Sequence, residues 1–440
     1  MKAVRGTGAV QAIFRLERTV NELLLIVMPA ATAISKAAVP PTGEGLSTIG
    51  SGRPATEKRR FYLREVDGIR CFAVLLVWLH HNPAGPGAVL HEFSANGWVG
   101  VNVFLVLSSF LITSLLLLEA EKKGSISPAR FYSRRVLRIW PLLGLALALN
   151  YLLLPAINYF PDGFRNQPFL QDLKYQAIPN ALLLGNWSAA VFGYLQYGFC
   201  NHLWTINLEE QFYLLWPILM FFLIKKPRRI LICCAALMAV SYVARYYYVS
   251  VGFKHPALWV STITRLDPLA LGAILALLYP HLRKWLAGRP RLAFSLLGVV
   301  VFAITSWLIV LTLRRWTWDY GDVWWKLGAV DAFVALCVCC VINTPVLAFF
   351  FRLPVVAWLG KISYGLYVYQ KFFVDSKFSI AIRAWCLQMT RGNDNLASWG
   401  LGILINSLAL VAVSAASYYC FERWFLKFKE RFESILSRPA

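Results

Sequence analysis

The sequence predicts an all-α membrane protein with about ten transmembrane helices and with both termini in the cytoplasm. Of its 440 residues, 58% are hydrophobic and only 15% are charged, and a soluble protein of this length cannot bury so much apolar surface. Apolar stretches long enough to cross a bilayer alternate with short basic segments. If the N-terminus is cytoplasmic, 32 of the 44 Lys and Arg residues fall in cytoplasmic segments and 12 in external ones, which is the bias that membrane proteins show.

Charge and cysteine content narrow the possible partners. A net charge of +22 would suggest nucleic acid in a soluble protein. Here the basic residues flank apolar stretches, so the expected partner is the lipid bilayer, and no nucleic acid is expected. The nine cysteines show neither metal-ligand spacing nor a paired extracellular pattern, so no metal site is expected. The sequence does not indicate an oligomeric state.

The chain divides into three predicted parts. Residues 1–60 are expected to be a poorly structured basic extension and linker, because their apolar run at 23–28 is too short to span a bilayer and residues 40–54 are rich in Pro, Gly, Ser and Thr. Residues 61–425 form the transmembrane domain, and residues 426–440 form a basic cytoplasmic tail. The expected spans are 67–83, 98–118, 138–158, 204–224, 229–249, 262–280, 293–313, 327–350, 355–375 and 399–421.

The first span carries an arginine and a histidine at its two ends. Arg70 and His81 are eleven residues apart, so on a helix they lie on one face, about 16 Å apart along the axis. His80 points about 80° away from that face. An arginine at the middle of a bilayer costs about 2.5–3.5 kcal/mol, and a functional role is one explanation for it. The alternative is an arginine that only sets orientation and a histidine that caps the far end.

Three arginines lie at the start of the third span. Arg134, Arg135 and Arg138 lie at an expected cytoplasmic helix start, and Arg135 and Arg138 share a face at a spacing of three residues. Arginines at the N-terminus of a helix suit a phosphate-rich ligand. Anchoring of the helix by the positive-inside rule is the alternative.

The fourth span begins with two adjacent carboxylates, Glu209 and Glu210. On a helix Glu209 falls on the same stripe as His202 and Thr205. Carboxylates within a span are costly unless they are paired or face a cavity. A role in a site and a structural pair with a neighbouring arginine are both open.

Taken in order, these motifs resemble the acyltransferase-3 family of membrane-bound O-acyltransferases, over about residues 61–425. The resemblance implies transfer of an acyl group, usually acetyl, from cytoplasmic acyl-CoA to a hydroxyl of a cell-surface or lipid-linked glycan, by a multi-pass protein of the bacterial inner (plasma) membrane. The motifs that carry it are Asp67-Gly68-Ile69-Arg70 with His81, Gly100-Val101-Asn102 with Leu107-Ser108, Arg134-Arg135 with Arg138-Ile139, Trp204 with Glu209-Glu210-Gln211-Phe212-Tyr213, Arg265 with Gly272, and residues 359–367.

The resemblance also implies roles for individual residues. His81 would act as general base on the acceptor hydroxyl or as a transient acyl carrier. Arg70 would pair with Asp67 or with phosphates of CoA, and Glu209 would orient His81. The nucleotide end of CoA would be held by Arg134, Arg135 and Arg138.

Three positions depart from the family pattern, and no role is assigned to them. Asn102 stands where the family usually has Asp, Ser109 where it has Gly, and Gln370 where it tends to have His. Two other functions remain open from the sequence. One is a transporter or flippase of glycans, which would use the same charges as a pathway. The other is an acyltransferase that acts on a small hydrophobic metabolite.

Overall fold

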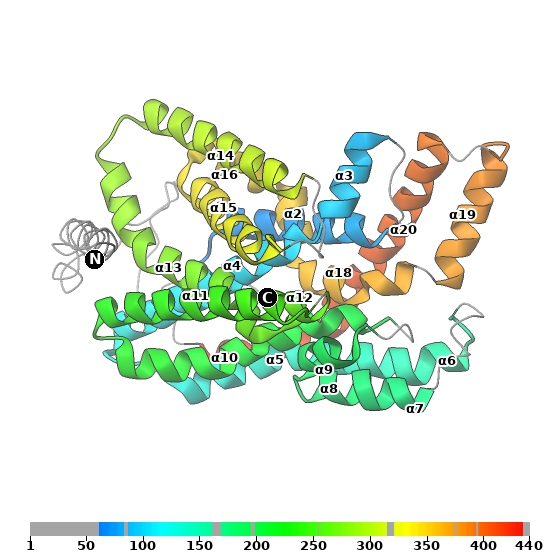
Figure 1. The fold of residues 1–440 in the computed structure, drawn as a ribbon, viewed down its shortest axis with the longest axis horizontal. Helices are drawn as coiled ribbons and strands as arrows, with labels where there is room; N and C mark the ends of the chain where they lie inside the picture. The colour runs from blue at the N-terminus through cyan, green and yellow to red at the C-terminus, as the bar shows by residue number, and fades with distance from the viewer. Residues whose placement is uncertain are drawn as a thin grey trace, which may run out of the picture.

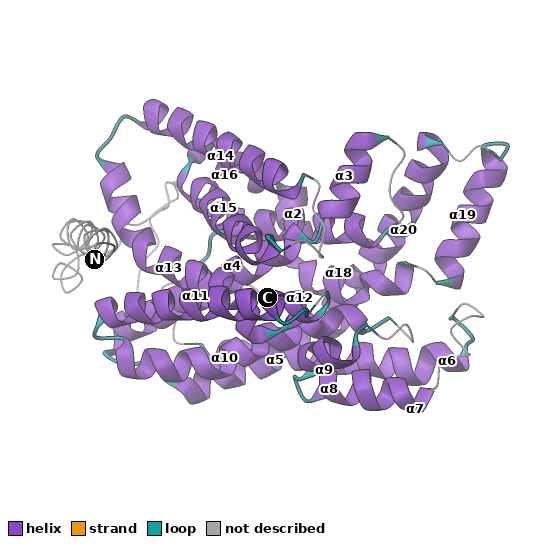
Figure 2. Ribbon diagram, in the orientation of Figure 1, coloured by secondary structure: helices purple, strands orange, loops and turns teal. Residues whose placement is uncertain are grey.

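A computed structural model describes residues 61–82, 87–160, 169–194, 199–253, 255–314, 321–374, 376–392 and 395–433. The predictions for residues 1–60 and for the end of the tail lie outside these residues. Every regular element in the described part of the chain is a helix, as Figure 2 shows, so the all-α class is confirmed.

Seven helices within the described residues are long and apolar enough to cross a membrane. The count of about ten spans and the cytoplasmic position of both termini stay predictions. The seven helices are Val99–Lys123 (α4), Pro128–Ala156 (α5 with η1 and α6), Pro227–Ser250 (α11), Thr262–Ala287 (η5 with α13), Arg291–Leu313 (α14), Val323–Asn343 (α15) and Leu396–Phe432 (α20, η7, α21 and η8).

The other three expected spans are shorter, more polar or broken. Helix α2 (Arg64–His81) covers the first, and α10 (Trp204–Leu223), with its two glutamates, covers the fourth. The span expected at 355–375 is not one helix, which corrects that prediction: it consists of α17 (Pro354–Lys361), α18 (Ser363–Tyr369) and the 3-10 turn η6 (Gln370–Phe373). Apolar periodicity cannot show this break, because the contact of α17 with a distant helix determines its course.

The remaining helices are short and lie between or beside the long ones, as Figure 1 shows. Several of them cover the described part of the connection between α6 and α10. The remaining short helices are α3 (Ala88–Asn96), α7 (Phe169–Asp172), η3 (Leu173–Ala177), α8 (Ile178–Ala181), α9 (Gly185–Phe192), η4 (Asn201–Leu203), α12 (Ala257–Val260), α16 (Pro345–Phe351) and α19 (Lys377–Met389), while η5 (Thr262–Arg265) leads directly into α13.

Helix α4 forms the centre of the molecule. It packs against α2, α13 (Leu266–Ala287), α15 and α10, and most of its apolar length is buried. Small residues permit these approaches, since a Cβ at Gly272 of α13 would overlap the main chain of α4. Helix α14 lies at the periphery with most of its apolar surface exposed, as expected of a helix that faces lipid.

Helix α2 is held by direct main-chain contact. It packs against α16 and α17, both from much later in the chain. A Cβ at Gly68 would overlap the carbonyl oxygen of Phe351, and a Cβ at Gly360 would overlap that of Asp67. The position of α2 therefore depends on two glycines that let backbone meet backbone.

Two ion pairs are completely buried among α11, α13 and α15. Arg245 Nη1 lies 2.9 Å from Asp267 Oδ2, and Arg265 Nη1 lies 3.2 Å from Asp331 Oδ2. The amide of Asn102, on α4, donates to Asp331 Oδ1 over 2.6 Å. In the low dielectric of the interior each charge depends on its partner.

Candidate active site

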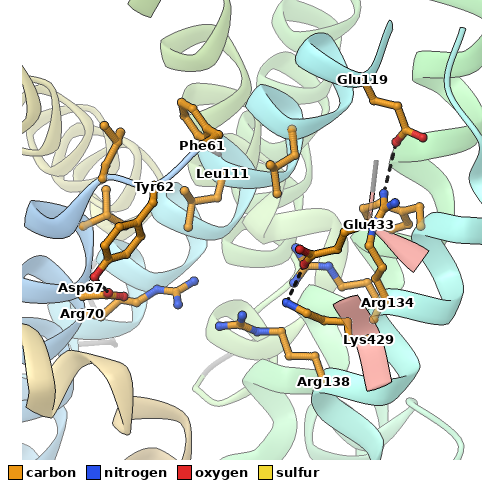
Figure 3. A pocket seen from close by; sticks show the side chains of 15 residues that line it. Phe61, Tyr62, Asp67, Arg70, Leu111, Glu119, Arg134, Arg138, Lys429 and Glu433 are labelled. Atoms are coloured by element: carbon orange, nitrogen blue, oxygen red, sulfur yellow. Dashed lines mark hydrogen bonds and ion pairs between the residues drawn. The ribbon is translucent and has the colours of Figure 1, made fainter. Parts of the chain in front are cut away.

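A pocket opens beside the N-terminal end of α2, between α4, α5 (Pro128–Ala148) and the C-terminal segment of the chain. Four of the arginines considered from the sequence meet there. Figure 3 shows the guanidinium groups of Arg70 and Arg138 pointing toward one another across it. Like charges that converge in this way favour an anionic ligand between them. The charged residues of the lining are Asp67, Arg70, Glu119, Arg134, Arg135, Arg138, Lys429 and Glu433.

Asp67 and Arg70 form one wall of the pocket. Asp67 is buried, with 3% of its surface exposed, and its Oδ2 accepts a hydrogen bond from Tyr62 Oη over 2.8 Å. The Tyr62 bond helps to hold the carboxylate of Asp67 in place. Arg70 lies on the same helix one turn later and reaches into the pocket (Figure 3).

Two cations of the opposite wall are already paired with carboxylates. Arg134 Nη2 lies 3.2 Å from Glu119 Oε2, and Arg134 Nη1 donates to the carbonyl of Phe432 over 3.0 Å. Lys429 Nζ lies 2.8 Å from Glu433 Oε1 (Figure 3). Arg134 therefore ties α4, α5 and the C-terminal segment together. We infer that it supports the pocket more than it binds a ligand.

The arginines do not lie at the helix N-terminus that the sequence predicted. Helix α5 begins at Pro128, ten residues before the expected span, so Arg135 and Arg138 lie along its second and third turns. The Arg135 guanidinium lies over the ring of Tyr213, 4.6 Å from its centroid, which fixes the direction of its charge. The case for an anion therefore rests on the guanidinium groups and not on the helix dipole.

Glu209 lies near this pocket and not in the described surroundings of His81. Its Oε2 accepts hydrogen bonds from Tyr213 Oη (2.7 Å) and Ser108 Oγ (3.2 Å). It also interacts electrostatically with Arg70 and Arg135. This arrangement corresponds to the structural pairing left open above, and a direct role in orienting His81 gains no support from these contacts.

His81 lies at the other end of α2, in a cluster with residues from η4 and η6. Its ring centroid is 6.2 Å from that of His202, and it interacts with Gln370 and with the charge of Lys371. The Nδ1 atom of His81 is buried without a hydrogen-bond partner among the described residues. His80 is different, since its Nδ1 donates to the carbonyl of Ser94 over 2.8 Å.

His202 is held in place by Tyr367. Its Nε2 donates to the Tyr367 carbonyl over 2.9 Å, and the Tyr367 hydroxyl donates to the His202 carbonyl over 2.8 Å. The same hydroxyl lies 2.6 Å from Thr205 Oγ1. The helical stripe predicted the proximity of His202 and Thr205, but the sequence gave no sign that η4 would bring His202 to His81.

Comparison with known proteins shows the family of the chain. A family model described as an acyltransferase domain matches residues 63–422, which is most of the chain. The chain belongs to the acyltransferase-3 family. It is 29% identical over 320 residues to O-acetyltransferase OatA of Staphylococcus aureus strains NCTC 8325 and COL, an alignment that covers 70% of this chain and 50% of each relative. The chain thus spans about half the length of the curated relatives it matches. No solved structure matches it.

Two departures from the acyltransferase-3 pattern have a packing explanation. Asn102 donates to Asp331, which already pairs with Arg265, whereas a carboxylate at position 102 would add a second negative charge there. Ser109 donates to the carbonyl of Leu269, so its hydroxyl joins α4 to α13. The third departure, Gln370, has no such explanation, because its side chain is buried and has no hydrogen-bond partner among the described residues apart from its interaction with His81.

Proposed function

We propose that this protein is an integral-membrane O-acyltransferase that moves an acyl group, in the first instance acetyl, from cytoplasmic acyl-CoA to a hydroxyl of a cell-surface or lipid-linked glycan. The observation that carries the proposal is the placement of the two ends of α2. Arg70 reaches into the arginine-lined pocket, and His81 joins the histidine cluster about 16 Å along the helix.

The pocket has the chemistry for the nucleotide end of CoA. Arg70, Arg135 and Arg138 supply planar guanidinium groups, which bind phosphate oxygens in pairs. Lys429 adds a further cation that Glu433 partly neutralises. Under the topology predicted from the positive residues, the pocket opens to the cytoplasm, where acyl-CoA is present.

His81 supplies the proton chemistry. An imidazole nitrogen takes the proton of the acceptor hydroxyl while the oxygen forms a bond to the thioester carbonyl carbon. The carbon–sulfur bond then breaks, and the CoA thiolate takes up the proton. A covalent acyl-histidine is the alternative route, in which the same nitrogen first attacks the thioester. Either route needs His81 beside both substrates.

An acyl-transfer assay tests this function. Protein purified into lipid nanodiscs should release CoA from labelled acetyl-CoA faster when glycan acceptors are added, and the label should appear on the glycan as a base-labile ester. A transporter would release no CoA. Labelling of a small hydrophobic alcohol in place of the glycan would favour an acyltransferase of metabolites. The multi-pass nature of the protein and the O-acetyltransferase name of its relatives favour the first outcome.

Arg138→Ala should raise the KM for acetyl-CoA by about 10-fold or more, because it removes a charge-assisted phosphate contact that is worth about 1.5–3 kcal/mol. Arg138→Lys should recover only part of the affinity, since a point charge cannot copy the guanidinium fork. Steady-state kinetics of both variants, with their yield and melting temperature, check this. Loss of folded protein with an unchanged KM would indicate that Arg138 only anchors the helix.

A further inference from the structure

We propose that Gln370 is a catalytic residue that donates a hydrogen bond from its amide to the carbonyl oxygen of the acyl group as His81 promotes the transfer. This inference rests on the proposed function and names a group that the family pattern does not supply at this position. It follows from the burial of Gln370, from its position beside His81, and from the charge near it.

The first observation is a buried amide whose hydrogen-bonding capacity is not filled. The side chain of Gln370 is completely buried, and apart from its interaction with the imidazole of His81 neither Oε1 nor Nε2 has a hydrogen-bond partner among the described residues. A carboxamide offers two donors and one acceptor, and almost all such groups in protein interiors are hydrogen-bonded. A side chain that served packing alone would be apolar at this position. The unsatisfied amide is therefore better explained by a bound molecule that completes it.

The second observation is convergence with His81 and His202. Gln370 begins η6, directly after α18, which packs against α2, and its side chain interacts with His81. The Nδ1 atoms of His81 and of His202 are also buried, with no further hydrogen-bond partner in the described part of the chain. Because the Nε2 of His202 donates to a carbonyl, its Nδ1 is an acceptor in the neutral ring. Three segments of the chain thus bring one amide and two imidazoles to one place.

The third observation is the charge of Lys371. It lies close enough to interact electrostatically with the imidazoles of His80, His81 and His202. A positive charge and an amide donor beside a general base are what an acyl transfer requires, since the carbonyl oxygen becomes negative when the hydroxyl adds to it. The imidazoles accept the hydroxyl proton, and the amide and the ammonium stabilise the oxyanion.

These groups complete a balanced reaction. The hydroxyl proton passes to His81, the hydroxyl oxygen bonds to the thioester carbon, and the carbonyl electrons move onto the oxygen beside the Gln370 amide. When the carbonyl re-forms, the carbon–sulfur bond breaks and the thiolate takes the proton from His81. The products are an ester and CoA, and no oxidant or further reactant is needed.

Substitution of Gln370 tests the inference with acetyl-CoA as donor and a lipid-linked glycan as acceptor. Gln370→Leu should lower kcat by about 10²- to 10³-fold, the loss typical when one oxyanion donor is removed, and should leave the KM for acetyl-CoA within about 3-fold. Gln370→His should recover activity above that of Gln370→Leu, because an imidazole can also donate a hydrogen bond and is the residue that the family tends to have there.

A matched amide separates catalysis from folding. The side-chain amide of Gln211 is fully hydrogen-bonded. Its Nε2 donates to the carbonyl of Leu183 and to Asn186 Oδ1. Gln211→Leu should therefore lower the melting temperature, whereas Gln370→Leu should leave it unchanged or raise it. A parallel loss of stability and activity in Gln370→Leu would overturn the inference, as would a kcat within 3-fold of wild type. If the wild-type protein transfers no acetyl group, the proposed function fails together with this inference.

Discussion

His81→Ala is expected to lower the rate of acyl transfer by about 10²- to 10⁴-fold, which is the contribution of a well-placed general base. His81 lies at the centre of the cluster with His202 and Gln370, and its Nδ1 has no described partner that would hold it in a purely structural role. Its removal should leave the distant pocket intact. The KM for acetyl-CoA should therefore change far less than kcat.

His80→Ala is the matched control, since it removes a neighbouring imidazole from the same helix. His80 donates to the carbonyl of Ser94 on α3, so its described contact is structural. We expect His80→Ala to retain most of the activity and to lose some thermal stability. The comparison requires transfer assays on both variants at equal amounts of folded protein. Full activity of His81→Ala would contradict the mechanism, whereas equal losses in both variants would indicate a general disturbance of α2.

Asp331→Ala is expected to destabilise the folded protein by about 3–5 kcal/mol, because it leaves Arg265 charged and buried without its carboxylate. Both side chains are completely buried, and Arg265 also lies over the ring of Trp259, 4.3 Å from its centroid. Water cannot reach the orphaned guanidinium to solvate it. The melting temperature of the detergent-solubilised protein, followed by size-exclusion chromatography after heating, measures the loss.

Asp322→Ala supplies the control, because Asp322 pairs with Lys326 four residues away and 39% of its side chain is exposed. Pairs of this kind contribute about 0.3–0.5 kcal/mol, so the melting temperature should hardly change. Equal and small effects of the two substitutions would mean that Arg265 finds another partner. In that case the buried network would not be the main support of this part of the bundle.

Local pattern predicted most of the long helices and the placement of Arg70 and His81 at the two ends of one helix. The first span, expected at 67–83, is α2 at Arg64–His81, and eleven residues of continuous helix do separate Arg70 from His81. Helical geometry also distinguished His81 from His80. Such features depend only on 3.6 residues per turn and on apolar segments of membrane length, and both can be read from a short stretch of sequence.

Contacts between distant segments could not be predicted in this way. Nothing near Arg134 in the sequence indicates that its partners are Glu119 and the carbonyl of Phe432. Gln370 was recognised only as a departure from a motif, and its proximity to His81 depends on a break in the expected helix. A single sequence predicts the individual helices. Which helix ends come together depends on shape complementarity across the whole bundle.

The contact of α2 with α16 and α17 fixes the position of this helix along its axis. Its two glycine contacts, at Gly68 and Gly360, join main chain to main chain, so neither rotamer changes nor side-chain flexibility can absorb a shift. An added methyl group at either glycine would displace the whole of α2 as a rigid unit, and Arg70 and His81 would move with it. The backbone therefore sets the separation between the proposed anion-binding end and the proposed reacting end, and an acyl donor for this site needs an arm long enough to match it.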